Sequence, residues 1–202
     1  MRYTGPKAKK ARRLGLAFTA KDAKILQRRN FAPGVHGQNR VRLSEYGTQL
    51  REKQKAKMAY GIQERQFEIY FNKALKQSGV TGNNLLTQLE KRLDNIVYRL
   101  GFGDTRAQAR QLVNHGFIEV NGKKVDIASF QVKIGDNVAI RAAKQKKAYV
   151  ERLKDKLKNF KTLDWLELSA DKYQGKIISA PDIDTLGNEI NTQLIVEHYS
   201  RT

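Results

Sequence analysis

The chain has 202 residues, of which 39 are Lys or Arg and 20 are Asp or Glu, so its formal net charge is +19. So large a surplus repels itself in the folded state and favours binding to a polyanion, whose released counterions help drive association. The absence of cysteine excludes disulfides and thiolate metal sites. No apolar run approaches the length of a membrane span, and no hydrophobic segment follows the basic N-terminus, so we expect a soluble intracellular protein.

The positive charge is concentrated toward the N-terminus. Residues 1–60 hold 16 Lys and Arg against 3 Asp and Glu, a net of +13, whereas residues 161–202 have a net charge of −3. We therefore expect the polyanion to lie along the first half of the chain. Net charge alone is compatible with either a nucleic acid or an anionic membrane surface as the polyanion.

Residues 1–43 show little apolar periodicity, and the stretch 32–38 is rich in turn-forming residues. We interpret this segment as an extended, irregular basic arm that becomes ordered on RNA and has little core of its own. A disordered tail without a specific role is the alternative.

Three helices are predicted next, over residues 44–60, 63–77 and 84–100. Ser44 can cap the first, and Gly61 ends it. This helix is polar almost all round, so its charged side chains are either solvated or neutralised by phosphate groups. The second helix has an apolar stripe that indicates core packing rather than base stacking, made of Phe67, Tyr70, Phe71, Ala74 and Leu75.

A mixed region follows. A short helix over 106–115 places Ala109, Leu112 and Val113 on one side, with polar residues beside them. Asn121-Gly122 predicts a hairpin between strands 117–120 and 123–125. Further strands are expected at 131–134, 138–140, 165–168 and 176–178, and further helices at 147–160 and 192–199. The pattern predicts an α+β protein: a mainly helical domain plus helices packed on a small, largely antiparallel sheet.

The motifs of this region resemble the S-four RNA-binding domain, a module also found in RNA-modifying enzymes and tRNA synthetases. The matching runs are Arg92-Leu93-Asp94-Asn95, Arg106 to Val113, Ile118 to Gly122 and Val125 to Phe130. The flanks are similar to the S-four family of bacterial small-subunit ribosomal proteins, through Arg2 to Pro6, Leu43 to Lys55, Tyr60 to Phe67 and Leu194 to Ser200. This second resemblance covers essentially the whole chain.

The resemblance implies three parts: a basic arm over 1–43, a helical domain over 44–91 completed by about 180–202, and the S-four domain with its following elements over 92–179. It implies primary binding to a multi-helix junction in the 5′ domain of 16S ribosomal RNA early in subunit assembly. It also implies contact with the neighbouring protein S five, in a region that controls decoding accuracy. The resemblance further implies a position near the channel through which messenger RNA enters.

Candidate RNA-binding residues follow from this resemblance and from the suitability of arginine for phosphate. They are Arg12, Arg13, Arg40 and Arg42 in the arm, Arg51, Lys53 and Lys55 in the helical domain, and Arg106, Arg110, Gln111, His115, Lys123 and Lys124 in the S-four domain. We expect the fold to be independent of Arg106 and Arg110; the alternative is that these arginines tie their helix to Asp94 or Asp104. Arg92 and Asp94 are expected to pair within the domain instead.

The sequence favours no catalytic, metal or small-molecule site. His36, His115 and His198 are far apart and lack metal-ligand spacing, and no phosphate-binding loop or nucleophile motif occurs. Many members of the family hold a metal through four N-terminal cysteines, which this chain lacks, so we expect no cofactor. An accessory RNA-modifying factor carrying an S-four domain remains an alternative, as does a membrane-bound basic protein. We expect neither enzyme activity nor membrane association.

Overall fold

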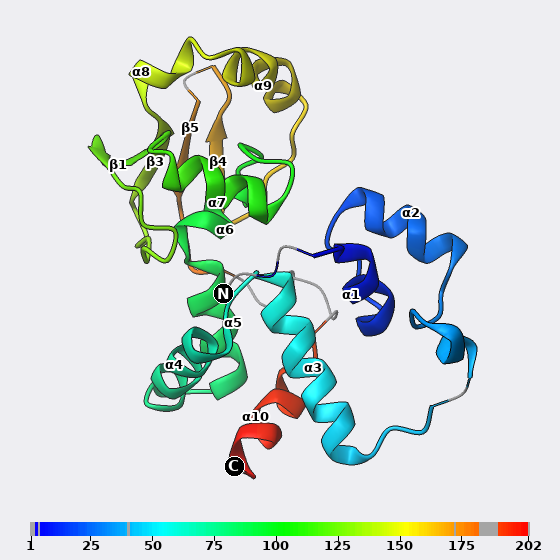
Figure 1. Ribbon diagram of the computed structural model, residues 1–202. Helices are drawn as coiled ribbons and strands as arrows, with labels where there is room; N and C mark the ends of the chain where they lie inside the picture. The colour runs from blue at the N-terminus through cyan, green and yellow to red at the C-terminus, as the bar shows by residue number, and fades with distance from the viewer. Residues whose placement is uncertain (1–2, 4, 40, 172, 182–189, 202) are drawn as a thin grey trace. The chain divides into compact units, whose positions relative to one another are not determined.

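The computed structural model describes residues 3, 5–39, 41–171, 173–181 and 190–201. By its internal contacts the chain divides into two compact units, residues 1–85 with 184–202, and residues 86–183. The first unit contains helices only among its described residues, and the second combines helices with a sheet (Figure 1). The α+β class is therefore confirmed.

The first unit is built on the long helix α3. Its elements are α1 (Lys7–Leu14), α2 (Ala20–Arg28), a 3-10 turn (Val35–Gln38), α3 (Glu45–Ala59), α4 (Glu64–Leu75), the start of α5 (Thr81–Glu90) and α10 (Thr192–Ser200). The Ser44 hydroxyl caps α3 by accepting a hydrogen bond from the Gly47 amide at 3.1 Å, as expected.

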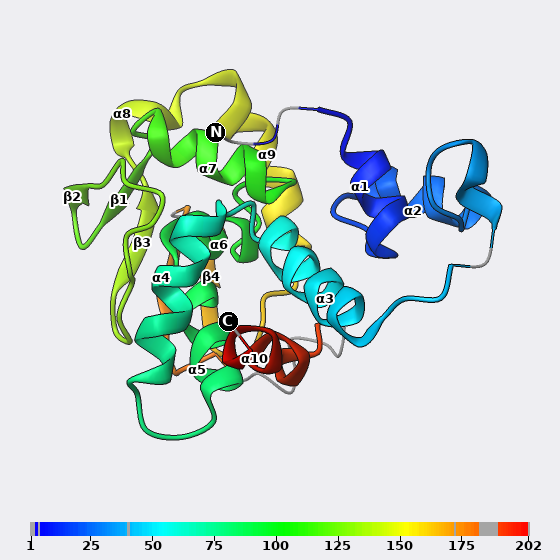
Figure 2. The ribbon, with the colours of Figure 1, turned by 60° about the horizontal axis from the view of Figure 1, so that its bottom comes forward.

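The C-terminal helix α10 lies along α3, and both ribbon views show the two side by side (Figure 2). Gln49 donates to Glu197 at 3.2 Å, and the Tyr199 ring stacks on Phe71 with centroids 4.3 Å apart. The chain end thereby completes the core of a unit that begins near the N-terminus. Leu75 was predicted to join that core but is 59% exposed, whereas its neighbour Ala74 in the same last turn of α4 is buried.

The N-terminal segment is not irregular, so that prediction is wrong. It forms α1 and α2, and it buries Ala11, Leu14 and Leu16. Thr19 caps α2 by accepting from the Asp22 amide at 3.2 Å. The buried apolar side chains are few, so the segment forms helices with only a small core of its own.

The second unit packs helices on a five-stranded antiparallel sheet of order β2-β1-β3-β5-β4. Its elements are α6 (Leu93–Arg99), α7 (Arg106–Asn114), β1 (Ile118–Val120), β2 (Lys123–Lys124), β3 (Asn137–Ile140), α8 (Ala142–Gln145), α9 (Ala148–Lys158), β4 (Leu166–Ser169) and β5 (Gln174–Ile177). Helices α6 and α7 lie across the sheet in Figure 1, and one continuous apolar core joins α6, α7 and α9 with strands β1, β3, β4 and β5.

The predicted helix over 84–100 is in fact two helices, because the chain becomes extended at Arg92 (φ −68°, ψ 137°). Arg92 forms an isolated bridge with Gln131, and the amide of Val132 donates to the carbonyl of Lys91 at 3.0 Å. The strand predicted over 131–134 reduces to this bridge among the described residues. Tertiary hydrogen bonds therefore override a continuous helical pattern.

The hairpin prediction is confirmed. Asn121 and Gly122 both adopt positive φ, at 50° and 76°, as a type I′ turn requires. The Asn121 side chain also donates to Asp136 at 2.8 Å and accepts from the Asn137 amide at 2.9 Å, which ties the turn to the start of β3.

Candidate RNA-binding surface

Helix α7 has one buried face and one polar face, as predicted. Thr105 caps it by accepting from the Gln108 amide at 3.2 Å. Ala109, Leu112 and Val113 are buried in the core of the second unit. The helix therefore presents Gln111, Asn114 and His115 to solvent.

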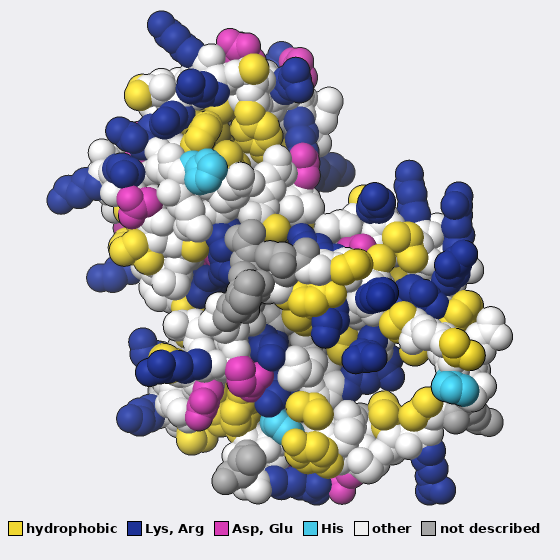
Figure 3. Space-filling view, in the orientation of Figure 1, with side chains coloured by type: hydrophobic (Ala, Val, Ile, Leu, Met, Phe, Trp, Pro, Cys, Tyr) yellow, Lys and Arg dark blue, Asp and Glu magenta, His cyan; other side chains and the backbone are white. Residues whose placement is uncertain are grey.

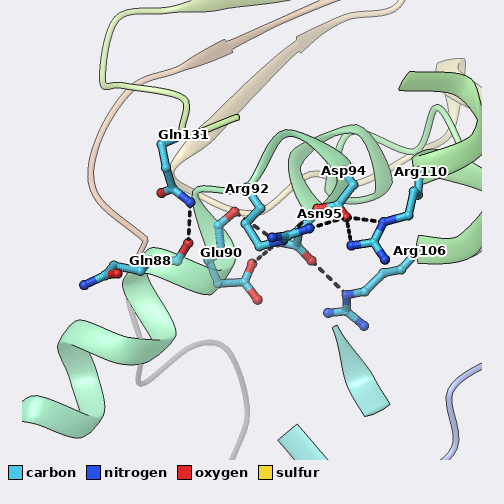
Figure 4. A network of polar contacts seen from close by, with 8 residues as sticks. All are labelled: Gln88, Glu90, Arg92, Asp94, Asn95, Arg106, Arg110 and Gln131. Atoms are coloured by element: carbon cyan, nitrogen blue, oxygen red, sulfur yellow. Dashed lines mark hydrogen bonds and ion pairs between the residues drawn. The ribbon is translucent and has the colours of Figure 1, made fainter. Parts of the chain in front are cut away.

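Asp94 anchors a buried ionic cluster at the start of α6 (Figure 4). The Asp94 carboxylate is 4% exposed and accepts from Arg92 through Nε at 3.0 Å and Nη2 at 2.8 Å. It also accepts from Arg110 through Nε at 2.8 Å and Nη2 at 2.6 Å. The expected Arg92–Asp94 pair is confirmed. The expectation that the fold is independent of Arg110 is wrong, because a buried carboxylate requires compensation.

Arg106 is positioned by a neighbouring chain of polar contacts. Its Nε donates to Asn95 Oδ1 at 2.8 Å, and its guanidinium lies 4.7 Å from the centre of the Tyr98 ring. The Asn95 amide in turn donates to Glu90 Oε2 at 2.6 Å. Glu90 is fully buried and pairs with Arg99 at 2.9 Å. The two arginines of α7 are thus held one turn apart by acceptors on α6 (Figure 4).

Sequence reasoning missed Glu90, Asn95 and Arg99 as members of this cluster. The available signal was the polar run Arg92-Leu93-Asp94-Asn95 inside an apolar helical pattern. Polar side chains on a buried face have to be satisfied by partners, and here those partners lie on the adjoining helices α5, α6 and α7.

The hairpin presents Lys123 and Lys124 as exposed side chains of β2. Lys124 pairs with Asp126 at 3.1 Å, and both side chains are about half exposed. A hydrogen bond from Lys124, with its positive charge, lowers the pKa of Asp126. An exposed pair of this kind is weak and leaves the lysine available to a phosphate.

The three basic candidates of α3 differ in how far their side chains are exposed. Lys53 is only 8% exposed, pairs with Glu64 at 2.8 Å and lies 5.3 Å from the centre of the Tyr199 ring. Its burial argues against contact with RNA, so we withdraw it from the surface. Lys55 is largely buried and pairs with Glu52 at 2.9 Å, whereas Arg51 is exposed.

Glu64 is the centre of this internal group. Burial alone would raise its pKa, but hydrogen bonds and attraction from Lys53 and Lys57 outweigh burial and lower the pKa to about 2. Glu64 also accepts from the Tyr199 hydroxyl at 3.2 Å, so it links α3, α4 and α10. The lysines of α3 that face Glu64 therefore serve the fold.

The arginines of the N-terminal segment also differ in whether they bond to the fold or are exposed. Arg12 donates through Nε to the Phe31 carbonyl at 2.9 Å and through Nη2 to the Ala32 carbonyl at 3.2 Å, and it lies over the Phe31 ring at 4.8 Å. It therefore holds the turn after α2 in place. Arg13 and Arg42 are exposed, and Arg40 lies outside the described residues.

The described residues contain no group of three or more His, Cys, Asp or Glu side chains that could hold a metal ion. Within that same part of the chain, no helix combines the length and apolar character needed to cross a membrane. The arrangement offers positioned guanidinium and ammonium groups rather than an acid–base or nucleophile pair. Figure 3 shows Lys and Arg side chains over the visible faces of both units.

Comparison with known proteins identifies the family of this chain. Residues 2–90 match the family model of the ribosomal protein S4/S9 N-terminal domain, and residues 91–138 match that of the S4 domain. The chain is 50% identical over 204 residues to the small ribosomal subunit protein uS4 of Chloroflexus aurantiacus, with 99% of both chains covered. The chain belongs to the uS4 family. The proteins named uS4 from Desulforamulus reducens and Thermoanaerobacter pseudethanolicus are 47% and 48% identical to it, again over 99% of both chains.

The boundary between the two family models coincides with a feature of the fold. The S4 domain model begins at Lys91, directly before the extended residue Arg92, and includes α6, α7 and the hairpin. The buried cluster of Asp94 and Asn95 and the exposed face of α7 therefore lie in the RNA-binding module that the sequence resemblance indicated.

Proposed function

We propose that this chain is a structural constituent of the small ribosomal subunit and a primary binder of 16S ribosomal RNA, without enzymatic activity. The observation that carries the proposal is the pair of α7 arginines, Arg106 and Arg110, fixed by buried acceptors beside exposed polar residues. Rigid donors lose little freedom on binding, so they suit the fixed phosphate pattern of a folded RNA.

The proposed RNA surface has two parts. The first comprises Arg106, Arg110, Gln111, His115, Lys123 and Lys124 in the second unit. The second comprises Arg12, Arg13, Arg40, Arg42, Arg51 and Lys55 in the first unit. The surplus of Lys and Arg in residues 1–60 supports a large electrostatic contribution from this second part.

The finer assignments follow the family resemblance. We propose that the RNA target is the multi-helix junction of the 5′ domain, that binding helps nucleate subunit assembly in the cytoplasm, and that contacts with protein S five support decoding accuracy. Messenger RNA near the channel entrance is a further proposed contact. A neutral or acidic face is suited to a protein neighbour, and the C-terminal residues 161–202 carry a net charge of −3.

Hydroxyl-radical footprinting of the full chain on protein-free 16S ribosomal RNA tests this proposal. We expect backbone protection at one multi-helix junction of the 5′ domain, with a 3′-domain fragment of the same RNA as the control. Replacing Arg13 and Arg42 with Ala should weaken that protection, because both side chains are exposed. Equal protection of both fragments, or none, would contradict specific binding.

A further inference from the structure

A shallow pocket of about 190 Å³ opens on the second unit, lined by Gln108, Gln111, Leu112, His115, Phe117 and Tyr149. The first four come from α7 and its C-terminal cap, and Tyr149 comes from α9.

The floor of the pocket is aromatic and apolar. The Tyr149 hydroxyl donates to the Phe102 carbonyl at 2.6 Å, so its polar end is directed at backbone. Burial, with repulsion from Asp104, raises the pKa of Tyr149 to about 12, which keeps the hydroxyl protonated for that bond. Phe117 and Tyr149 both pack partly against the core. Gln111 and His115, which are exposed, add hydrogen-bonding groups at the rim.

Three cationic side chains surround the segment Gly116-Phe117 at one side of the pocket. The Lys144 ammonium lies 5.3 Å from the centre of the Phe117 ring, and Arg141 donates to the Gly116 carbonyl at 3.2 Å. A Cβ on Gly116 would lie 2.8 Å from Cε of Lys124, so that lysine crosses directly over the glycine. An aromatic surface thus adjoins a concentration of positive charge.

We propose that this pocket binds one unpaired nucleobase of the ribosomal RNA, with the adjoining phosphates held by Lys124 and Lys144. The proposal rests on the proposed RNA-binding function and deepens it. A base stacks on aromatic rings, and sequence-specific recognition of folded RNA relies on such unstacked bases. The volume is below the roughly 300–1,000 Å³ of sites for drug-sized ligands, which suits a single ring system. A free anion would make no use of the aromatic floor.

The test compares Phe117→Leu with Phe160→Leu in the full chain bound to 16S ribosomal RNA. Both phenylalanines are partly buried and lie beneath a lysine, since Lys156 is 6.0 Å from the Phe160 ring, but only Phe117 lines the pocket. Base-specific chemical probing and equilibrium affinity are measured together, with hydroxyl-radical footprinting of the RNA backbone. We expect Phe117→Leu to expose one or two bases to modification and to weaken binding about 5- to 100-fold. Phe160→Leu should leave both unchanged.

A second variant, Gln111→Ala with His115→Ala, changes only exposed rim positions and decides the matter if Phe117→Leu does not fold. It should expose the same bases. If the wild type protects the RNA backbone but neither pocket variant changes any base, the pocket proposal is overturned and the proposed function stands. If the wild type leaves the RNA backbone unprotected, the proposed function fails and the pocket proposal fails with it.

Discussion

The second unit and the N-terminal segment both carry basic side chains, but they hold them differently. In the second unit, Arg106 and Arg110 are fixed by Asn95 and Asp94 on a helix packed into a continuous core. In residues 3–43, the apolar burial is limited to Ala11, Leu14 and Leu16, and Arg13 and Arg42 are exposed. The donors of the second unit have therefore lost their conformational freedom during folding, whereas we propose that the exposed arginines of the N-terminal segment lose theirs on binding RNA.

This difference teaches that a basic side chain is not a binding residue by charge alone. Lys53 and Arg51 are two residues apart on α3, yet the first is buried against Glu64 and the second is exposed. Arg110 is intermediate, because it holds Asp94 while its side chain remains 16% exposed. Variants at these positions distinguish a role in folding from a role in RNA binding.

The largest expected effect is on the stability of the second unit in Asp94→Ala. The substitution removes a buried carboxylate that accepts from both Arg92 and Arg110, and breaking a buried ion pair typically costs about 3–5 kcal/mol of unfolding free energy. Trp165 is the only tryptophan of the chain and is buried in this unit, so its fluorescence in urea reports the unfolding. Asp126→Ala removes an exposed partner of Lys124 and is the matched control. Equal midpoints for the two variants would contradict the structural role of the cluster.

The second prediction concerns Arg106→Ala combined with Arg110→Ala. We expect RNA affinity to fall by about 2–5 kcal/mol, since each arginine loses charge-assisted hydrogen bonds to phosphate. Unfolding free energy should fall by about 1.5–3 kcal/mol, mainly through Arg110 and its bonds to Asp94. Arg152→Ala with Lys154→Ala removes two exposed charges of the same unit and should change stability little. Normal RNA binding by the folded fraction of the α7 double variant would show that its arginines serve folding alone.

Deletion of residues 1–43 should affect RNA binding more than it affects the second unit. The deletion removes 12 Lys and Arg and one Asp. If three or four phosphate contacts are lost, the slope of log affinity against log salt becomes shallower by about 2–3. Some stability of the first unit should also be lost, because α1 buries Ala11 and Leu14. The Trp165 transition should not move, and a large shift in it would show that the segment supports both units.

The smallest effect expected is a pH dependence in the first unit. His198 is 5% exposed, and burial, with repulsion from Lys53, lowers its pKa despite attraction from Glu64. The unfolded chain, with a histidine pKa of about 6.5, therefore takes up the proton first, so stability should fall as pH drops below that value. His198→Gln should reduce this fall, as followed by circular dichroism in urea from about pH 7.5 to 5.5. His36→Gln changes an exposed histidine and should not.

The sequence predicted the elements whose local signals agree with their tertiary setting. The α3 cap at Ser44, the buried face of α7 and the Asn121-Gly122 turn all follow from short patterns. The break at Arg92 was not predictable from periodicity, because it depends on hydrogen bonds to residues near 131. The two N-terminal helices were missed because they bury few side chains, Ala11 and Leu14 from α1 and Asp22 from α2.

The candidate surface was predictable only in outline. Charge and family resemblance indicated the segments, but the roles of Lys53, Arg12 and Arg110 depend on Glu64, Phe31 and Asp94, which are identified only in the folded chain. The pocket beside His115 required Tyr149 from α9, and no sequence pattern connects those two positions. Tertiary contacts decide whether a cation pairs within the fold or stays available to RNA. Composition therefore overestimates the number of cations available to RNA.

We propose that cations held on a preformed fold bind ribosomal RNA through its phosphates. The salt dependence of equilibrium binding between the full chain and the 16S 5′ domain tests it most directly. With about six to eight phosphates neutralised, log affinity should fall against log salt with a slope near −5. A slope shallower than about −2 would contradict the claim, because so few released counterions could not account for binding by the proposed surface.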